Sequence, residues 1–339
     1  MGGRVMKIRV AAICTESYYG QEEYRNAERA LKYVDEAAAL GAELVSFPEG
    51  YPGPCHGPLD SGGRLPFKPM DALREKAREH GVYITASDLE ENSEIPDTFY
   101  LTQKLISPKG EILANYKRVQ PDHQDLNAFL TGGRRHILPG DEIMVVETKL
   151  GNLGLQICSE LFVPEISRIQ MLKGADLIVA PVNGVHRDTQ FRMNHTWRCI
   201  AHARAAENLL FVIVPENVFL TNGRVHALKV GCIVGPEGFL AMAEGPGIMV
   251  ATLNMERLNW LRTRYVEEEL LAAPKDPDNF RPIKARPGQN HDRRPELYGL
   301  LAQPQADAFD YFYFRKGLDS WPENYQRVRK QPRPGKRLP

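Results

Sequence analysis

The sequence has no excess of charge of either sign, because 43 Lys and Arg residues balance 43 Asp and Glu residues among 339 positions. Without a net field, binding to nucleic acid or to a membrane surface is disfavoured. No apolar run reaches the length of a membrane span, and the first residues, MGGRVMKIRVAAIC, lack the long apolar core of a signal peptide. We therefore expect a cytoplasmic protein.

Paired cysteines are also missing. The five cysteines are Cys14, Cys55, Cys158, Cys199 and Cys232. Their odd number and the lack of short paired spacings argue against a disulfide framework and a structural zinc site. His195 and His202 share one face of a predicted helix, but the closer i, i+4 spacing and a carboxylate ligand are missing, so we expect no metal site.

Strand-like and helix-like segments alternate along the first 262 residues. Residues 7–14 are apolar and rich in β-branched residues, as strands are, residues 42–50 are expected to form a second strand that ends at Pro48-Glu49, and residues 21–40 have apolar positions at helical spacing. Three pairs of strands joined by tight turns are expected at 100–117, 145–158 and 230–245. This α/β pattern predicts sheets covered by helices, in one four-layer domain from about Lys7 to Arg262.

The composition changes after this region. Residues 274–295 are rich in proline and charge and poor in apolar residues, which predicts an extended C-terminal arm. Apolar segments follow, LYGLL and then FDYFYF, and we expect them to pack on this domain or on a neighbouring subunit. The last ~10 residues are expected to be disordered.

Cys158 lies where a buried strand, GLQIC, turns into an amphipathic helix that ends at Gly174. A side chain at such a turn is exposed at the end of the sheet, and the unpaired N–H groups of the following helical turn favour a thiolate. The alternative is a small buried hydrophobic residue. Cys55 beside His56 is a second candidate thiol, but it lies in a Pro/Gly loop without a rigid strand behind it.

Two other reactive side chains follow apolar strands, Glu49 after LVSFP and Lys117 after EILANY. The ends of strands in layered α/β folds are where functional sites form. The three residue types complement one another, because a carboxylate can accept the thiol proton, a lysine can stabilise an oxyanion, and a thiolate can attack an electrophilic carbon. Each residue alone has an ordinary structural explanation, so the combination carries the hypothesis.

These segments resemble the carbon-nitrogen hydrolase family, also called the nitrilase superfamily. The resemblance covers most of residues 7–300 and rests on AELVSFPEGYP, SPKGEILANYKR, the long segment around GLQICSELFVPE, RCIAHARAAENLLFVIVPEN and RRPELYGLL. It implies a four-layer αββα sandwich with a Glu-Lys-Cys triad, which corresponds to Glu49, Lys117 and Cys158. Residues 1–300 then form the hydrolase domain, and residues 301–339 are a C-terminal extension.

The resemblance also implies a mechanism. Glu49 accepts the proton of Cys158, the thiolate attacks an amide, ureide or nitrile carbon, and Lys117 with the Ser159 N–H group holds the developing negative charge. Water then cleaves the thioester. No metal or organic cofactor is required, the substrate is a small molecule, and a homodimer or higher homo-oligomer is expected.

One departure from the family concerns a second glutamate between the lysine and the cysteine. The segment RVQPDHQDLNAFLTGGRRHILPG contains no glutamate. Asp125 matches one spacing of that residue in the family, as in aliphatic amidases, whereas the β-ureidopropionase pattern places Ala128 there. Asp125 is therefore a possible fourth catalytic or substrate-positioning residue.

Further residues are expected near the substrate, namely Tyr51, His123, Glu160 and Asn183. Nitrilases usually follow the cysteine with Trp-Glu, whereas this chain has Ser159 and Glu160. D-carbamoylases place arginines after the cysteine, where this chain has Leu161 and Phe162. These differences favour an amidase or ureidase that acts on a neutral or partly apolar small molecule over a nitrilase, with a catalytically weak binding protein as the third alternative.

Overall fold

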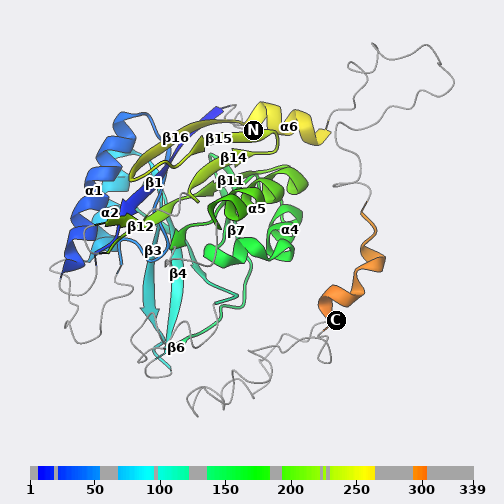
Figure 1. The fold of residues 1–339 in the computed structure, drawn as a ribbon, viewed down its shortest axis with the longest axis horizontal. Helices are drawn as coiled ribbons and strands as arrows, with labels where there is room; N and C mark the ends of the chain where they lie inside the picture. The colour runs from blue at the N-terminus through cyan, green and yellow to red at the C-terminus, as the bar shows by residue number, and fades with distance from the viewer. Residues whose placement is uncertain are drawn as a thin grey trace.

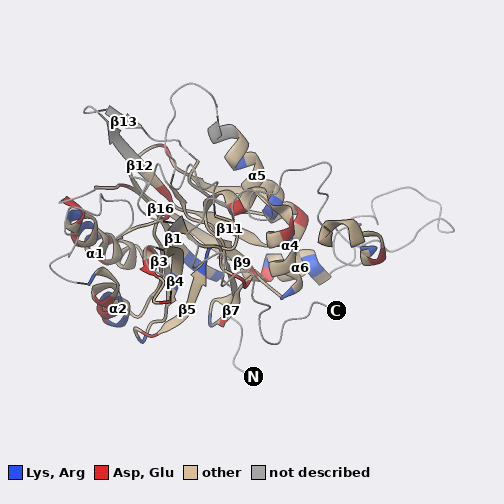
Figure 2. Ribbon diagram, turned by 90° about the horizontal axis from the view of Figure 1, so that it is seen from below, with Lys and Arg blue, Asp and Glu red and all other residues tan. Residues whose placement is uncertain are grey.

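The computed structural model describes residues 7–18, 22–53, 68–94, 98–121, 136–183, 193–221, 224–226, 230–263 and 293–303. Two β-sheets stack face to face, and helices cover the outer face of each sheet (Figures 1 and 2). Figure 2 shows the layers in order, with α1 and α2 on one side and α4 and α5 on the other. The predicted four-layer αββα sandwich is confirmed.

Ten described strands form the larger sheet, in the order β10-β12-β1-β2-β3-β4-β5 with β13, β16 and β6 attached to β12, β1 and β4. They are β1 Lys7–Glu16, β2 Leu44–Ser46, β3 Tyr83–Glu91, β4 Thr98–Ile106, β5 Ile112–Lys117, β6 His136–Ile137, β10 Val182–Asn183, β12 Glu216–Thr221, β13 Arg224–His226 and β16 Gly247–Asn254. The smaller sheet has the order β15-β14-β11-β9-β8-β7. Its strands are β7 Val145–Thr148, β8 Gly151–Leu155, β9 Leu177–Val179, β11 Phe211–Val214, β14 Cys232–Gly235 and β15 Gly238–Met242.

Helices are present at the positions predicted for residues 21–40, for the segment between Cys158 and Gly174 and for the segment with His195 and His202, whereas the helix Met255–Thr263 was not predicted. The described α-helices are α1 Tyr24–Ala39, α2 Pro69–His80, α4 Pro164–Leu172, α5 Met193–Asn208 and α6 Met255–Thr263. The described short 3-10 helices are η3 Cys158–Phe162, η4 Pro295–Leu297 and η5 Gly299–Ala302. Gly81 ends α2 in the left-handed conformation at φ 67°, which a residue without a Cβ adopts at little cost.

Two apolar clusters hold the layers together. One lies between the sheets and includes Leu105, Tyr116 and Leu153. The other lies between the larger sheet and the helices α1 and α2, and includes Val34 and Ile84. Because successive side chains of a strand point to opposite faces, the strands β1, β2, β3 and β4 contribute to both clusters.

The β4–β5 hairpin contains an irregularity that bears on the site. Leu105 pairs with Ala114, whereas Ile106 pairs with Ile112, so Leu113 is an extra residue on β5. An extra residue of this kind is a β-bulge, and it changes which side chains of the strand face the core.

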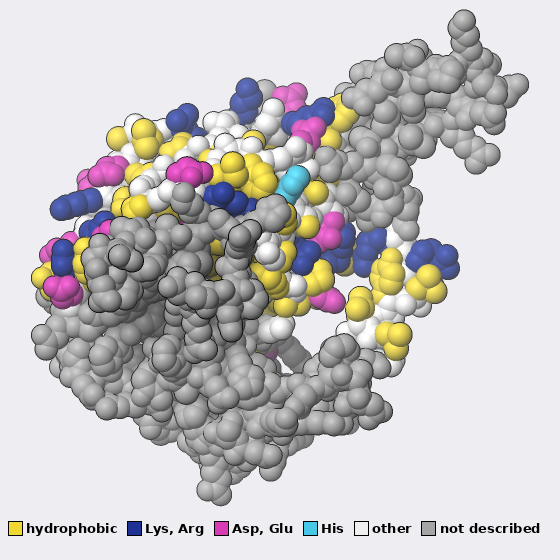
Figure 3. Space-filling view, viewed as in Figure 1, with side chains coloured by type: hydrophobic (Ala, Val, Ile, Leu, Met, Phe, Trp, Pro, Cys, Tyr) yellow, Lys and Arg dark blue, Asp and Glu magenta, His cyan; other side chains and the backbone are white. Residues whose placement is uncertain are grey.

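Residues 293–303 form the last described segment, drawn in orange in Figure 1. Leu297, Leu300 and Leu301 are 64 to 68% exposed, and Figure 3 shows hydrophobic side chains gathered on this segment. The extended arm expected at 274–295, the FDYFYF segment and the disordered end lie almost entirely outside the described residues. No helix in the described ranges is long and apolar enough to cross a membrane.

Candidate functional site

Glu49 lies at the end of β2, in a tight turn between the two sheets. The Tyr51 N–H group donates to the Pro48 carbonyl at 3.2 Å, and Gly50 takes a left-handed conformation at φ 66°. The Glu49 side chain is almost completely buried. Its Oε2 atom accepts a hydrogen bond of 2.8 Å from the Asn183 N–H group. The local sequence therefore turns a carboxylate away from solvent and fixes it at the strand end.

Cys158 is the first residue of η3, directly after the segment that continues β8. Its φ of +55° lies in the left-handed region, which is uncommon for a residue with a side chain and is typical of functional sites. Its N–H group donates to the carbonyl of Pro181 at 2.8 Å, which fixes the turn against the neighbouring strand connection. The thiol-bearing residue is 8% exposed. The predicted turn after a buried strand is present.

Arg118 joins these two elements. Its Nη1 atom lies 3.1 Å from Oε1 of Glu49, and its Nη2 atom donates a hydrogen bond of 2.5 Å to Oγ of Ser159. The Arg118 side chain is only 2% exposed, so this guanidinium is buried between the carboxylate and the turn that carries Cys158. The structure thus brings Glu49, Arg118, Cys158 and Ser159 into one cluster.

Lys117 does not join this cluster, although the sequence predicts it there. Its Nζ atom lies 3.6 Å from Oε1 of Glu90 and 3.8 Å above the centre of the Tyr100 ring. The cause is strand alternation, because Tyr116 and Arg118 share the face of β5 that points between the sheets and Lys117 points to the other face. The cation in contact with Glu49 is therefore Arg118, and the structure does not place Lys117 beside Glu49 as the sequence predicts.

Sequence reasoning missed Arg118, although a signal was present. Ala114 and Tyr116 are apolar or aromatic residues at alternate positions, and continuing this alternation by two residues leads to Arg118. The sequence instead favours Lys117, because Lys117 is the first charged residue after the predicted strand EILANY.

Glu160 is also placed differently from its prediction. It is completely buried, and burial raises the pKa of its carboxyl group above the ordinary value, although Arg118, Gln120, Ile157 and Tyr116 oppose that rise. Its carboxylate accepts hydrogen bonds from the Tyr116 hydroxyl (2.8 Å) and from the N–H groups of Ile157 (2.7 Å), Val119 (2.7 Å) and Gln120 (2.9 Å). Glu160 has no surface to offer a substrate, and it ties the segment after β5 to the cysteine turn instead.

The other predicted substrate residues have mixed positions. Tyr51 is fully buried, stacks on Phe47 with 5.7 Å between ring centres, and donates from its hydroxyl to the Asn26 carbonyl at 2.9 Å. Asn183 reaches Glu49 through its backbone. His123 and Asp125, like Cys55 and His56, lie outside the described residues.

Further side chains, not predicted from the sequence, hold the cluster in place. Asn217 on β12 donates from Nδ2 to the Glu49 carbonyl at 2.7 Å. Arg204 on α5 donates from Nε to the Leu161 carbonyl at 2.9 Å and from Nη2 to the Phe162 carbonyl at 3.3 Å, which satisfies the end of η3. Gly140 approaches so closely that a Cβ atom there would lie 2.2 Å from the Lys117 carbonyl oxygen.

Among the described residues, one group of potential metal ligands lies together, formed by Asp35, Glu79 and His80. Lys76 already occupies this group, with Nζ 2.6 Å from Asp35 Oδ1 and 2.9 Å from Glu79 Oε2. His80 Nε2 lies 2.7 Å from the same Asp35 oxygen. The arrangement is that of an ion-pair cluster between α1 and α2, remote in the fold from Cys158.

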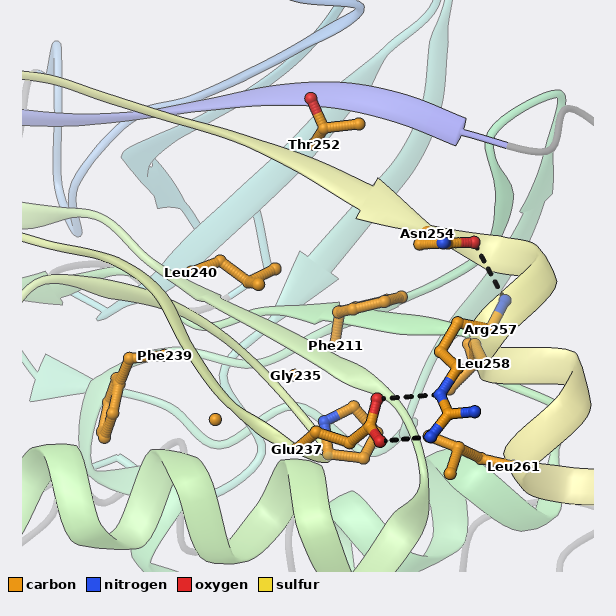
Figure 4. Close-up of a pocket in the computed structure, with 12 residues that line it drawn as sticks. Phe211, Gly235, Glu237, Phe239, Leu240, Thr252, Asn254, Arg257, Leu258 and Leu261 are labelled. Carbon is orange, nitrogen blue, oxygen red and sulfur yellow. Dashed lines mark hydrogen bonds and ion pairs between the residues drawn. The ribbon is translucent and has the colours of Figure 1, made fainter.

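A cavity of about 220 Å³ lies at another edge of the sandwich, between the β14–β15 hairpin, β16 and α6 (Figure 4). Its lining is largely apolar and includes Phe211 and Leu258, and at its rim Arg257 forms two hydrogen bonds with Glu237 of 2.7 and 3.1 Å. None of the residues around Glu49 and Cys158 lines it.

Comparison with protein-family models gives a match to carbon-nitrogen hydrolase over residues 9–263. This chain belongs to the carbon-nitrogen hydrolase family. The matched range contains both sheets and the whole cluster around Glu49, Arg118 and Cys158. The predicted family membership is confirmed.

Two relatives of this carbon-nitrogen hydrolase are named amidases. It is 28% identical to the deaminated glutathione amidase of Synechocystis sp. over 247 residues, which cover 70% of this chain and 89% of that protein. It is 27% identical to the human omega-amidase NIT2 over 242 residues, which cover 70% and 86% of the two chains. By this homology the protein is an enzyme of the amidase type.

Solved structures show the same fold. An amidase from Nesterenkonia sp. AN1, with the acetamide moiety of fluoroacetamide added covalently at its active-site cysteine, superposes with a TM-score of 0.61 at 22% identity, over 78% of this chain and 95% of that chain. The NitFhit protein of C. elegans superposes with a TM-score of 0.64 at 20% identity, over 80% and 66% of the two chains.

Proposed function

We propose that this carbon-nitrogen hydrolase cleaves the amide or ureido carbon–nitrogen bond of a small molecule through a thioester on Cys158. The observation that carries the proposal is the buried guanidinium of Arg118, which contacts the Glu49 carboxylate and the turn of Cys158 at the same time. A base, a cation and a thiol in a buried site are the groups that acyl transfer by a cysteine requires.

The first half of the reaction forms the thioester. Glu49 takes the proton of the Cys158 thiol, and the thiolate attacks the carbonyl carbon of the substrate. Arg118 and the Ser159 N–H group stabilise the negative charge that develops on the carbonyl oxygen. The carbon–nitrogen bond then breaks, and Glu49 returns its proton to the departing nitrogen, which leaves as ammonia or an amine.

The second half regenerates the enzyme. Glu49 accepts a proton from water as the water oxygen attacks the thioester carbon. The carbon–sulfur bond breaks, the acid product leaves, and the proton on Glu49 restores the Cys158 thiol. Asp125 stays a proposed fourth residue for placing this water or the substrate.

Support for small amides as substrates comes from the relatives. A Nesterenkonia amidase variant was solved in complex with butyramide, and other relatives are named amidases. The apolar Leu161 and Phe162 after the cysteine turn offer no charged group to an acidic substrate in that position, which favours a neutral or partly apolar molecule.

The test is release of ammonia or amine from a panel of amides, carbamoyl compounds and nitriles, together with the mass of the enzyme during turnover. Turnover of amides or ureides with an acyl adduct on Cys158 is expected, and Cys158→Ala should abolish turnover while keeping the melting temperature. Exclusive turnover of nitriles would indicate a nitrilase. Binding without turnover would indicate a binding protein on the same fold.

We also propose that the protein is a homodimer or a higher homo-oligomer and that it is located in the cytoplasm. The oligomer is supported by the exposed apolar side chains of Leu297, Leu300 and Leu301, because apolar side chains gathered on a surface are typical of an interface. Leu301 lies near α4, and on that helix Leu172 is also 56% exposed. Chromatography with light scattering should give at least twice the chain mass of 38.2 kDa. A monomer at that mass would refute the oligomer, and fractionation of cells tests the compartment.

A further inference from the structure

We propose that the Ser159 side chain positions Arg118, so that the two residues act as one unit in this enzyme. This inference rests on the proposed function, because it assigns a role to a side chain that the reaction itself does not use. The family triad has a lysine as its cation. In this chain the cation is an arginine, and a hydroxyl lies within hydrogen-bond distance of it.

The contact between the two residues is short and partly buried. Nη2 of Arg118 donates to Oγ of Ser159 at 2.5 Å, and the guanidinium is 2% exposed. Hydrogen bonds from a charged donor are stronger than neutral ones, and low dielectric surroundings strengthen them further. A contact of this kind orients the planar guanidinium rather than only attracting it.

The contact also completes a continuous series of hydrogen bonds. The Asn183 N–H group holds one oxygen of Glu49, and the other oxygen lies against Nη1 of Arg118. Nη2 continues the series to Ser159, the residue directly after Cys158. The planar guanidinium of Arg118 therefore links the position of Glu49, the base, to the position of the turn that carries Cys158.

The shape of the arginine explains why a hydroxyl is needed. A guanidinium offers several N–H groups in a fixed fork, whereas a lysine ammonium is a compact charge on a flexible stem. One arm of this fork faces Glu49, and the other must have an acceptor in the direction that the fork imposes. The side chain after the cysteine is the group that lies there, and a tryptophan at this position would offer no oxygen acceptor.

The first experiment compares Ser159→Ala with Ser159→Thr, which keeps the hydroxyl. Ser159→Ala should lower kcat about 10- to 100-fold, the loss expected for a hydrogen bond to a charged group, and change KM less than about three-fold. Ser159→Thr should restore most of kcat. Ser107→Ala is the control, because it removes a buried serine hydroxyl that accepts hydrogen bonds from two backbone N–H groups in the turn between β4 and β5, and it should leave both constants unchanged.

The second experiment needs no turnover. The rate at which iodoacetamide alkylates Cys158 is measured for the wild type, Ser159→Ala, Arg118→Met and the double variant. When Arg118 is present, Ser159→Ala should slow alkylation at least about three-fold. In the Arg118→Met background, Ser159→Ala should have no effect, because the hydroxyl acts through the guanidinium.

Three results would overturn the inference: an unchanged kcat in Ser159→Ala, a rise of KM alone, or an equal effect of Ser159→Ala on alkylation with and without Arg118. Failure of the proposed function gives a different result. In that case the wild type hydrolyses no compound of the panel, while the alkylation series still reports whether Ser159 and Arg118 are coupled.

Discussion

Nη1 of Arg118 lies 3.1 Å from Oε1 of Glu49, across 69 positions of the sequence. Both side chains are almost completely buried, with 2% and 5% of their surface exposed. A buried pair of opposite charges is held by geometry and further hydrogen bonds rather than by attraction alone. Removal of either partner therefore leaves an uncompensated buried charge.

Substitution of the two neighbouring basic residues should have opposite outcomes. Arg118→Ala should lower kcat/KM at least about 100-fold, because it removes the cation of the site. Lys117→Ala should change kcat/KM less than about three-fold and cost at most about 1 kcal/mol of stability, since its pair with Glu90 is partly exposed. Steady-state kinetics and urea unfolding measure both effects, and a large kinetic loss in Lys117→Ala would reinstate the lysine as the cation.

Gly140 should not tolerate a methyl group. A Cβ atom there would lie 2.2 Å from the Lys117 carbonyl oxygen, and backbone atoms have little freedom to move away. Gly140→Ala should destabilise the fold by about 2 kcal/mol or more and also lower kcat, because the displaced backbone carries Arg118. Gly245→Ala is the control, since its Cβ atom would meet nothing within 4 Å. Equal melting temperatures of the two variants would contradict the close approach.

Glu160 should make stability depend on pH with a definite sign. Burial raises the pKa of this carboxyl group in the folded state, so between its ordinary and its raised pKa the folded chain holds a proton that the unfolded chain has lost. Stability should therefore fall as pH rises through this interval. Unfolding of the wild type and of Glu160→Gln from pH 4 to pH 8 isolates the contribution. A constant difference between their unfolding free energies at all pH values would show that the residue does not titrate there.

The cysteines should differ in alkylation. Burial raises the pKa of Cys232 to about 12, so about one molecule in ten thousand carries its thiolate at pH 8. Burial raises the pKa of Cys14 still further. We expect iodoacetamide to label Cys158 and the exposed Cys199, and a substrate to protect Cys158 alone. Peptide mass spectrometry distinguishes the sites, and protection of Cys199 rather than Cys158 would place the substrate elsewhere.

Much of the fold follows from sequence because its signals are local. Alternating apolar residues, helical spacing and glycine stops identify elements such as β1, α1, α4 and the β4–β5 hairpin, although not β16 or α6, and two of the predicted strand-end residues, Glu49 and Cys158, lie in one cluster. Their positions depend only on where a strand ends, and that is visible in the sequence.

The remaining part of the site depends on which face of the strand each side chain points to and on tertiary contacts. Lys117 and Arg118 are adjacent basic residues, and their sequence alone does not say which of them points between the sheets. Ile112 and Leu113 are both apolar yet 43% and 40% exposed, so they give no guide to the buried face. The roles of Glu160 and Asn217 likewise come from donors and acceptors on distant segments, which no local pattern encodes.

The bulge at Leu113 gives this hairpin an evolutionary consequence. Because the bulge sets the face of β5 to which the following residues point, a gain of one residue before Tyr116 that the bulge did not absorb would move Lys117 to the position that Arg118 occupies. The enzyme would then change its cation without a substitution at any site residue. Within this family, the length of the β4–β5 hairpin can therefore carry as much functional information as the identity of the residues that it ends with.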